Sequence, residues 1–137
     1  MRVQQLADRL NVAPHVVRYY TRVGLLRPKR EAANGYRRFS ADDVKRVVFI
    51  RQAQRLGFTL AEIGHILEVS SRGKTPCPTV RAIVEERIAQ NAAYLAELQA
   101  LQERMTRARR RWRRMRDGVP DGNAICRLIE AVSEKLA

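Results

Sequence analysis

The stretch from Thr79 to about Arg116 constrains this chain most, because its apolar residues recur on alternating steps of four and three. That spacing is the repeat of a two-stranded coiled coil. No Gly or Pro interrupts the stretch, so one helix of about 55 Å is expected. The apolar positions of the repeat are Val80, Val84, Tyr94, Leu98, Leu101, Met105, Ala108, Trp112 and Met115.

A helix of this length with one narrow apolar stripe cannot bury itself within a chain of 137 residues. An intramolecular hairpin would need a second long helix, and the sequence offers none. We therefore expect the helix to pair with a second copy of the chain, in antiparallel orientation. Two polar seam positions, Arg87 and Asn91, would fix the register of that pairing at some cost in stability.

Length and composition leave room for one domain of ordinary size plus an appendage. No stretch approaches a transmembrane run, and the first ten residues lack the apolar core of a signal peptide. We therefore expect a cytoplasmic protein with no membrane partner. The two cysteines do not make a disulfide framework, so they are candidates for thiol chemistry instead.

The net charge of +13 is unevenly distributed. Residues 1–58 carry thirteen Lys or Arg against four acids, which is the electrostatic footprint of a nucleic-acid binder. Charge alone is weak evidence, because membranes and acidic proteins also attract it. Residues 104–116 hold eight arginines and no acid. That run is either a solvated face or a contact with flanking DNA or with acids of a partner chain, and the sequence leaves this open.

A helix-turn-helix is predicted at the N-terminus. The first helix covers Val3 to Leu10, and the second begins at Pro14 and ends near Gly24. The second helix of such a motif enters the major groove of DNA. A plain helical hairpin with a solvated basic face is the alternative. Candidate DNA-facing residues on the second helix are His15, Val16, Arg18, Tyr19 and Arg22.

A basic hairpin is predicted directly after this motif. Leu25–Arg27 and Tyr36–Phe39 are strand-like runs, and Asn34-Gly35 between them is a strong hairpin signal. We expect the hairpin to act as a wing that lies along the phosphates, with contacts from Tyr36, Arg37 and Arg38.

Further helices follow the wing. The first runs from its Ser40 cap to about Leu56, with Val44, Val47, Val48 and Ile50 expected in the core. The second covers Leu60 to Glu68, with Thr59 and Glu62 forming a capping box. Beyond the long helix, residues 117–123 form a loop and Ala124 to Leu136 a terminal helix.

Several short motifs together resemble the MerR family of bacterial transcription regulators over essentially the whole chain. They are Val17-Arg18-Tyr19-Tyr20, Gly24-Leu25-Leu26, Asn34-Gly35-Tyr36-Arg37, Asp43-Val44, and the run from Leu56 to Ile63. The resemblance implies a homodimer whose winged helix-turn-helix domains are joined by an antiparallel coiled coil. It also implies binding to a palindromic operator in a promoter, distortion of that DNA when an effector binds, and indirect action on RNA polymerase.

The resemblance also gives the two cysteines a role. In an antiparallel coiled coil, the start of one helix lies beside the end of its partner, so Cys77 of one subunit could meet Cys126 of the other. In the metal-sensing branch of the family this is where the metal sits. A helix N-terminus also favours the thiolate form of Cys77, which binds soft metals.

This chain departs from that branch at the start of the loop, where further cysteines are replaced by Arg116 and Asp117. A three-thiolate mercury or lead site is therefore disfavoured. Two thiolates alone suit copper(I) or mercury(II), whereas two thiolates with Asp117 or Asp121 suit zinc or cadmium. Asp121 is more typical of a turn than of a ligand. One or both thiols could also be small buried residues.

The sequence thus predicts a mainly α protein in three parts. Residues 1–75 would form the winged helix-turn-helix domain, 76–116 the dimerisation helix, and 117–137 an effector-binding loop and short helix. A dimeric regulator that senses a thiophilic metal and activates a promoter is the leading hypothesis. A thiol-based redox regulator and a ligand-independent architectural DNA binder are the alternatives. An enzyme is not expected, because the sequence has no Ser-His-Asp triad, no Gly-rich phosphate loop, and no paired histidine and carboxylate at ligand spacing.

Overall fold

Two short helices joined by a tight turn begin the chain, as the sequence predicts. In this computed structural model α1 covers Val3–Leu10 and α2 covers Pro14–Arg22. Asn11 ends α1 in the left-handed backbone region, with φ of 54°. Asn tolerates this region better than most residues, which explains the sharp reversal before α2. α1 packs against both α2 and a later helix, α3 (Ala41–Arg55).

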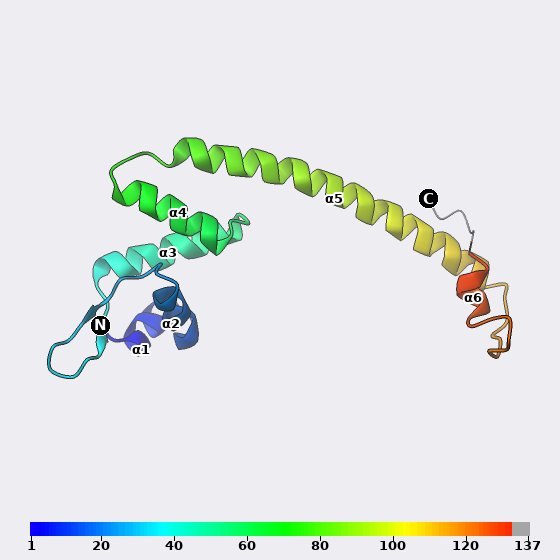
Figure 1. Cartoon of the computed structure of the whole chain (residues 1–137), viewed down its shortest axis with the longest axis horizontal. Helices are drawn as coiled ribbons and strands as arrows, with labels where there is room; N and C mark the ends of the chain where they lie inside the picture. The colour runs from blue at the N-terminus through cyan, green and yellow to red at the C-terminus, as the bar shows by residue number, and fades with distance from the viewer. Residues whose placement is uncertain (133–137) are drawn as a thin grey trace. The chain divides into compact units, whose positions relative to one another are not determined.

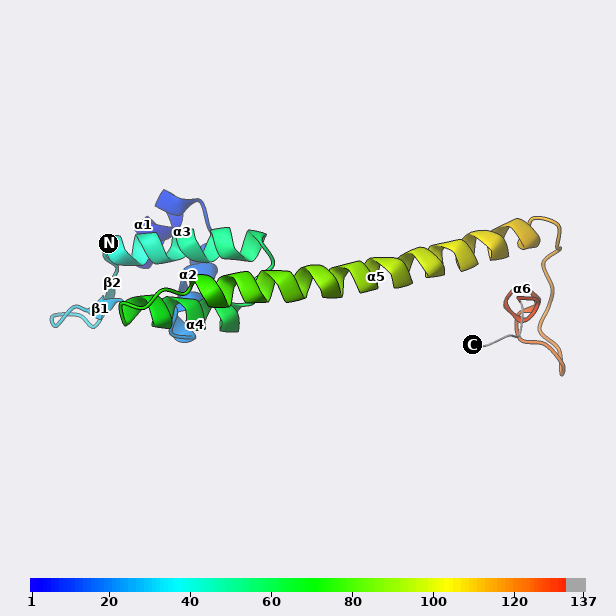
Figure 2. The same cartoon turned by 90° about the horizontal axis from the view of Figure 1, so that it is seen from above.

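The wing is a two-stranded antiparallel hairpin made of β1 (Lys29–Arg30) and β2 (Arg37–Arg38). Its register pairs Lys29 with Arg38 and Arg30 with Arg37. Figures 1 and 2 both show the hairpin loop extending away from α1, α2 and α3. Within the loop, Gly35 N donates to the Glu31 carbonyl at 2.9 Å. This bond spans four residues, so the loop is longer than a two-residue Asn-Gly turn.

The predicted first strand, Leu25–Arg27, is wrong. The backbone N–H groups of Leu25 and Leu26 donate to the Tyr20 carbonyl at 2.9 and 3.3 Å, so they close the end of α2 instead of pairing with a strand. Gly24, at φ of 86°, makes that closure possible. Both leucine side chains are buried in the core, so their apolar character reflects packing and not strand formation.

Side-chain caps set the starts of the next two helices. At α3, Ser40 Oγ accepts from Asp43 N at 3.4 Å, and Ser40 N donates to Asp43 Oδ2 at 2.9 Å. At α4 (Leu60–Ser71), Thr59 N donates to Glu62 Oε1 at 2.8 Å and Glu62 N donates to Thr59 Oγ1 at 3.1 Å. Both are capping boxes. α4 runs three residues beyond the predicted end at Glu68.

The hydrophobic core lies entirely among residues of α1–α4 and their connections. Val47 and Ile50 of α3 are buried as predicted, and Val44 is half-buried. Val48 is 42% exposed, which corrects its placement in the core. The helix period turns Val48 one step away from the buried face that Val47 and Ile50 share. The buried hydrophobic residues are Leu6, Ala7, Val17, Tyr20, Leu25, Leu26, Phe39, Val47, Ile50, Ala53, Phe58, Ile63 and Ile66.

The long helix α5 covers Cys77–Trp112 without interruption (Figure 1). It begins two residues earlier than predicted and ends four residues before Arg116, where the chain enters turns. α5 contains no buried residue. The middle of its apolar stripe is exposed, at Tyr94, Leu98, Leu101 and Met105. The stripe residues nearer its two ends, Val80, Val84, Ala108 and Trp112, are half-buried.

A loop and the short helix α6 (Arg127–Glu130) follow α5. The structure describes residues 1–132, so the end of the predicted terminal helix, up to Leu136, lies outside the described residues. The chain divides into two compact units, Met1–Arg81 and Ala82–Ala137. They are called unit 1 and unit 2 below. No helix among the described residues is long and apolar enough to cross a membrane.

Candidate nucleic-acid interface and thiol positions

Helix α2 presents a polar face to solvent because one aliphatic and one aromatic side chain are buried on its opposite face. Val17 and Tyr20 are buried against unit 1, and the Tyr20 hydroxyl donates to Gln54 Oε1 of α3 at 3.0 Å. These contacts fix the rotation of α2 about its axis. The face turned to solvent carries the exposed residues His15, Arg18, Tyr19 and Arg22, with Val16 half-buried beside them.

The wing carries a second group of exposed polar and basic residues. Tyr36 is 56% exposed, and the Arg2 guanidinium lies 4.5 Å from the centroid of its ring. This cation–π contact adds Arg2 to the basic surface of the wing. Sequence reasoning missed Arg2, because nothing in the sequence pattern links the start of α1 to a hairpin more than thirty residues later.

Arg38 is the one predicted DNA contact that the structure pairs with an acid. Its Nη1 donates to Glu31 Oε1 at 2.6 Å, and Asn34 Nδ2 donates to Glu31 Oε2 at 3.1 Å. Hydrogen bonds from Asn34 first, and then from Arg38, lower the pKa of Glu31 below its ordinary value. Glu31 is therefore ionised at neutral pH and offsets the charge of Arg38. The neighbouring Arg37 is half-buried and forms no ion pair with any residue between 1 and 132.

One buried carboxylate secures the base of the wing. Asp43 is only 3% exposed, and its Oδ1 accepts from Arg27 N at 3.3 Å while Oδ2 accepts from Ser40 N. Arg46 Nε of the same helix donates to the Leu25 carbonyl at 2.7 Å. α3 thus holds both the chain that enters the wing and the chain that leaves it. A buried carboxylate needs such donors, because otherwise its desolvation would be costly.

The two cysteines lie in different units. Cys77, in unit 1, is exposed at the first turn of α5, and its backbone N donates to Thr75 Oγ1 at 3.2 Å. Cys126, in unit 2, is half-buried directly before α6. Its backbone N donates to Glu130 Oε1 at 3.1 Å. Within residues 1–132, no group of three or more His, Cys, Asp or Glu could hold a metal ion in a single chain.

Of the predicted oxygen ligands, Asp117 is exposed and Asp121 forms a turn. Asp121 Oδ1 accepts from Asn123 N at 2.7 Å and from Ala124 N at 2.9 Å. These bonds match the turn-forming role that Asp favours. They occupy one carboxylate oxygen of Asp121. The Asp117 carboxylate is exposed and has no hydrogen-bond partner in the described part of the chain.

Trp112 fastens this loop to the end of α5. Its indole Nε1 donates to the Leu128 carbonyl at 2.6 Å, and the ring is half-buried. The backbone of Ile125 also donates to the Glu130 carboxylate, at 3.1 Å. The loop that carries Cys126 is thus closed by two side chains, Trp112 from before it and Glu130 from after it. The sequence placed Trp112 only on the apolar repeat of the long helix, and it gave no indication of the role of Glu130.

Two family models match the chain. One, described as MerR HTH family regulatory protein, covers residues 1–69, and the other, described as MerR, DNA binding, covers residues 44–108. The chain belongs to the MerR family. The residues that the two models match include the α1–α2 motif, the wing and the helices that follow it.

Relatives of known structure or curated function extend over nearly the whole chain. The regulator ZntR of Escherichia coli K12 is 29% identical over 97% of this chain and 92% of its own. The crystal structure of PbrR691 from Ralstonia metallidurans CH34 in complex with lead(II) has a TM-score of 0.77 at 26% identity, covering 97% and 99%. That of MerR from Bacillus megaterium MB1 in complex with mercury(II) has a TM-score of 0.58 at 29% identity, covering 96% and 98%.

Membership of the MerR family confirms the predicted fold class and the prediction that the chain is a transcription regulator and not an enzyme. It also supports binding to DNA. The DNA contacts and the thiol site remain predictions at the level of single residues.

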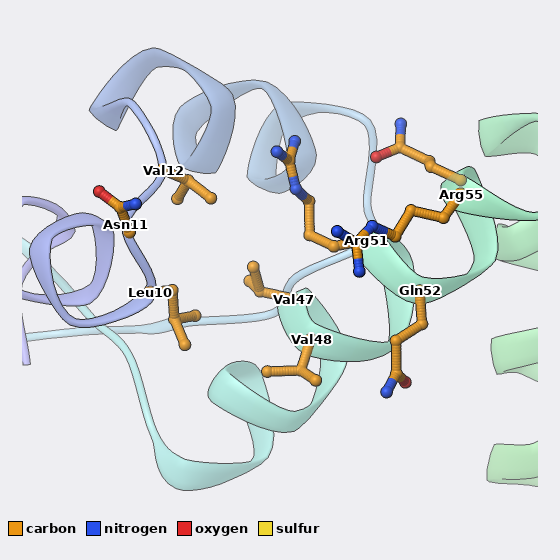
Figure 3. A pocket seen from close by; sticks show the side chains of 9 residues that line it. Leu10, Asn11, Val12, Val47, Val48, Arg51, Gln52 and Arg55 are labelled. Carbon is orange, nitrogen blue, oxygen red and sulfur yellow. The ribbon is translucent and has the colours of Figure 1, made fainter.

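The surface of this MerR-family unit 1 also carries a hollow of ≈ 510 Å³ between the end of α1 and α3, shown in Figure 3. Aliphatic side chains such as Val12 and Val48 and the guanidinium-bearing Arg51 and Arg55 line it. None of its lining residues is a Cys, His, Asp or Glu. The hollow therefore supplies no metal ligand.

Proposed function

We propose that the chain is a homodimeric, metal-responsive transcription regulator that acts on a palindromic operator. Two copies pair through α5 in antiparallel orientation, and each presents unit 1 to one half of the operator. The exposed apolar stripe of α5 supports this pairing. Tyr94, Leu98, Leu101 and Met105 are each between 41% and 66% exposed. Apolar residues at coiled-coil spacing are typically buried by a second helix.

The operator contacts come from α2 and the wing. Arg18 and Tyr19 reach the DNA from α2, with His15, Val16 and Arg22 beside them. Tyr36, Arg37 and Arg38 of the wing bind phosphates, which positions the protein without reading sequence. The exposure of most of these side chains supports these roles, although Val16 and Arg37 are half-buried. Replacing Arg18 with Ala should weaken operator binding by about 1–3 kcal/mol if Arg18 makes a base-specific contact.

The work divides among three parts of the chain. Residues 1–75 bind DNA, residues 76–116 pair the two copies, and residues 117–137 bind the effector. In the antiparallel dimer, residues 117–137 of one copy lie near the start of the partner's α5, so the effector site adjoins the partner's DNA-binding unit.

The effector is a thiophilic metal ion held by Cys77 of one copy and Cys126 of the other. Three observations support this: the two thiols lie in different units, no metal-ligand cluster forms among the described residues of one chain, and relatives bind lead(II) and mercury(II). The donor set fits such an ion, since thiolates prefer zinc, cadmium, copper(I), mercury and lead.

The coordination number would select among these metals. Two thiolates alone suit the linear geometry of copper(I) or mercury(II), whereas zinc and cadmium need further ligands. Asp117 could supply an oxygen. Asp121 is the weaker candidate, because one of its oxygens already accepts two backbone hydrogen bonds.

Metal binding would then act on the promoter through the DNA. Bending a site of 20–30 base pairs by tens of degrees costs about 1–6 kcal/mol. Effector binding at the ends of the coiled coil must favour the distorted complex by a similar amount. RNA polymerase would respond to the altered DNA and not to direct contact with this chain.

Metal stoichiometry of the reduced protein tests this function. We expect one tightly bound ion per chain in the wild type and loss of tight binding in both Cys77→Ser and Cys126→Ser. Asp117→Asn and Asp121→Asn form a matched pair, of which only the first should weaken zinc binding. Tight binding that survives both cysteine changes would refute the site. A disulfide between copies at cellular redox potential, without metal affinity, would favour a thiol-based redox regulator.

A further inference from the structure

The arginine run at the end of α5 is not used by the function proposed above. It contains eight arginines between residues 104 and 116 and no acid. Among the described residues, the recorded ion pairs are Arg38–Glu31 and Arg72–Glu68, so none involves the run. Eight guanidinium groups therefore share thirteen residues without an ion pair to any carboxylate of residues 1–132.

Four of these arginines lie close together at the end of α5 and in the turn that follows. Arg107, Arg110 and Arg111 share one side of α5 by their spacing of three and four residues, and Arg114 lies in the turn after Trp112. Together with Met115 they line a surface hollow of ≈ 610 Å³. All four are exposed. We call these four residues the arginine stripe.

The arginine stripe should repel itself when nothing is bound. Like charges three and four positions apart destabilise a helix, and the stripe contains several such pairs. The C-terminal end of the helix dipole offsets only part of that repulsion. A ligand with several negative charges would relieve it.

A second copy of α5 cannot neutralise the whole run. Residues 77–103, the part of α5 that an antiparallel partner would place beside it, hold four Glu and two Arg. Their surplus of two acids leaves six of the eight arginine charges unmatched. Phosphates fit better, because the planar guanidinium group binds them with two parallel hydrogen bonds.

We propose that the arginine stripe binds phosphates of DNA outside the operator core. The inference rests on the antiparallel dimer proposed above, in which the end of α5 lies beside the start of the partner's α5 and hence beside the partner's DNA-binding unit. The stripe then extends the basic surface of that unit. DNA is the polyanion that unit 1 already recruits, so its local concentration at the stripe is high.

The test uses two DNA duplexes that contain the same operator. The operator is the sequence that the wild-type protein selects from random DNA. One duplex ends at the operator, and the other extends it by about one helical turn, or ~10 base pairs, on each side. The stripe variant carries Arg107→Gln, Arg110→Gln, Arg111→Gln and Arg114→Gln. The matched control carries Arg104→Gln, Arg109→Gln, Arg113→Gln and Arg116→Gln, which removes the same charge from the other half of the run.

We expect the stripe variant to bind the long duplex about tenfold or more weakly at low salt, with affinity for the short duplex unchanged. Its slope of log affinity against log salt on the long duplex should fall by about 0.9 for each lost phosphate contact. The control variant should keep most of the wild-type slope. Circular dichroism and sedimentation verify that both variants fold and assemble as the wild type does.

Three results would overturn the proposal: unchanged slopes for the stripe variant, an equal loss in the control, or loss of dimerisation, which would place the partner's acids at the stripe. Binding of inorganic tripolyphosphate with unchanged DNA slopes would also overturn it in favour of a small-anion site. Failure of the operator contacts is distinguishable, because Arg18→Ala should weaken binding to both duplexes.

Discussion

At the scale of single residues, Glu31 is an acid placed inside the basic wing, which is predicted to contact DNA. It holds Arg38 at 2.6 Å and is ionised at neutral pH because its pKa is lowered. The pair is lost only as the pH falls through that lowered pKa. We predict that Glu31→Gln frees the Arg38 guanidinium for a phosphate and raises DNA affinity, with the salt slope steeper by about 1 for each added contact.

Operator titrations at several salt concentrations measure this effect. Glu68→Gln is the matched control, because Glu68 forms an exposed ion pair with Arg72 on α4, outside the predicted interface. It removes the same charge and should change the salt slope little. A lower affinity for Glu31→Gln than for the wild type would mean that Glu31 holds the wing in its binding shape.

Trp112 offers a second prediction at this scale. Trp112→Phe keeps an aromatic ring but removes the indole donor to the Leu128 carbonyl. A hydrogen bond of this kind contributes about 0.5–1.5 kcal/mol, so metal affinity should fall by up to about tenfold if the loop must be closed to present Cys126. Competition with a metal chelator measures it. Tyr94→Phe, elsewhere on α5, is the control, and equal losses in both variants would contradict the role of Trp112.

At the scale of elements, the capping box at the start of α4 gives a stability prediction. Thr59 Oγ1 accepts from Glu62 N, so Thr59→Ala leaves a helix N–H without its cap. The free energy of unfolding should fall by about 1 kcal/mol. Urea titration followed by circular dichroism measures the change. Ser70→Ala, in the last turn of the same helix, should leave the stability nearly unchanged, and a similar loss there would argue against the cap.

The elements also show which features of the fold follow from sequence. The starts of α1 to α4 match the prediction, because signals such as the Ser40 and Thr59 caps act locally. The terminal helix was predicted from Ala124 but begins at Arg127. The first wing strand was misplaced, because the burial of Leu25 and Leu26 comes from contacts with distant parts of the chain. The same reason hid Arg2, whose partner Tyr36 is brought near only by the fold. Features set by neighbouring residues could be predicted from the sequence, and contacts between distant segments could not.

At the scale of the whole molecule, the proposed metal site takes one thiol from each of two copies. Cys77 and Cys126 were found from sequence as candidate thiols, but in that proposal the atoms they meet belong to a second copy. Burial of the apolar stripe of α5 also requires a second copy in this proposal, because the middle of the stripe is exposed in one chain. The site and the pairing helix are therefore tested together by changes that prevent dimerisation.

Leu98→Asp tests that dependence. Leu98 is 49% exposed on the apolar stripe, and a buried leucine contributes about 1.5–3 kcal/mol. A dimer would lose this in both copies and bury two charges besides, so its dissociation constant should rise by at least about a hundredfold. Sedimentation should give twice the mass of one chain for the wild type and the mass of one chain for Leu98→Asp. The neighbouring Gln99→Asp adds the same charge off the stripe and should remain dimeric.

A dimeric Leu98→Asp, or a wild type that is monomeric at micromolar concentration, would contradict pairing through α5. Metal binding provides a second readout, because the monomeric variant keeps both thiols and should still lose the tightly bound ion.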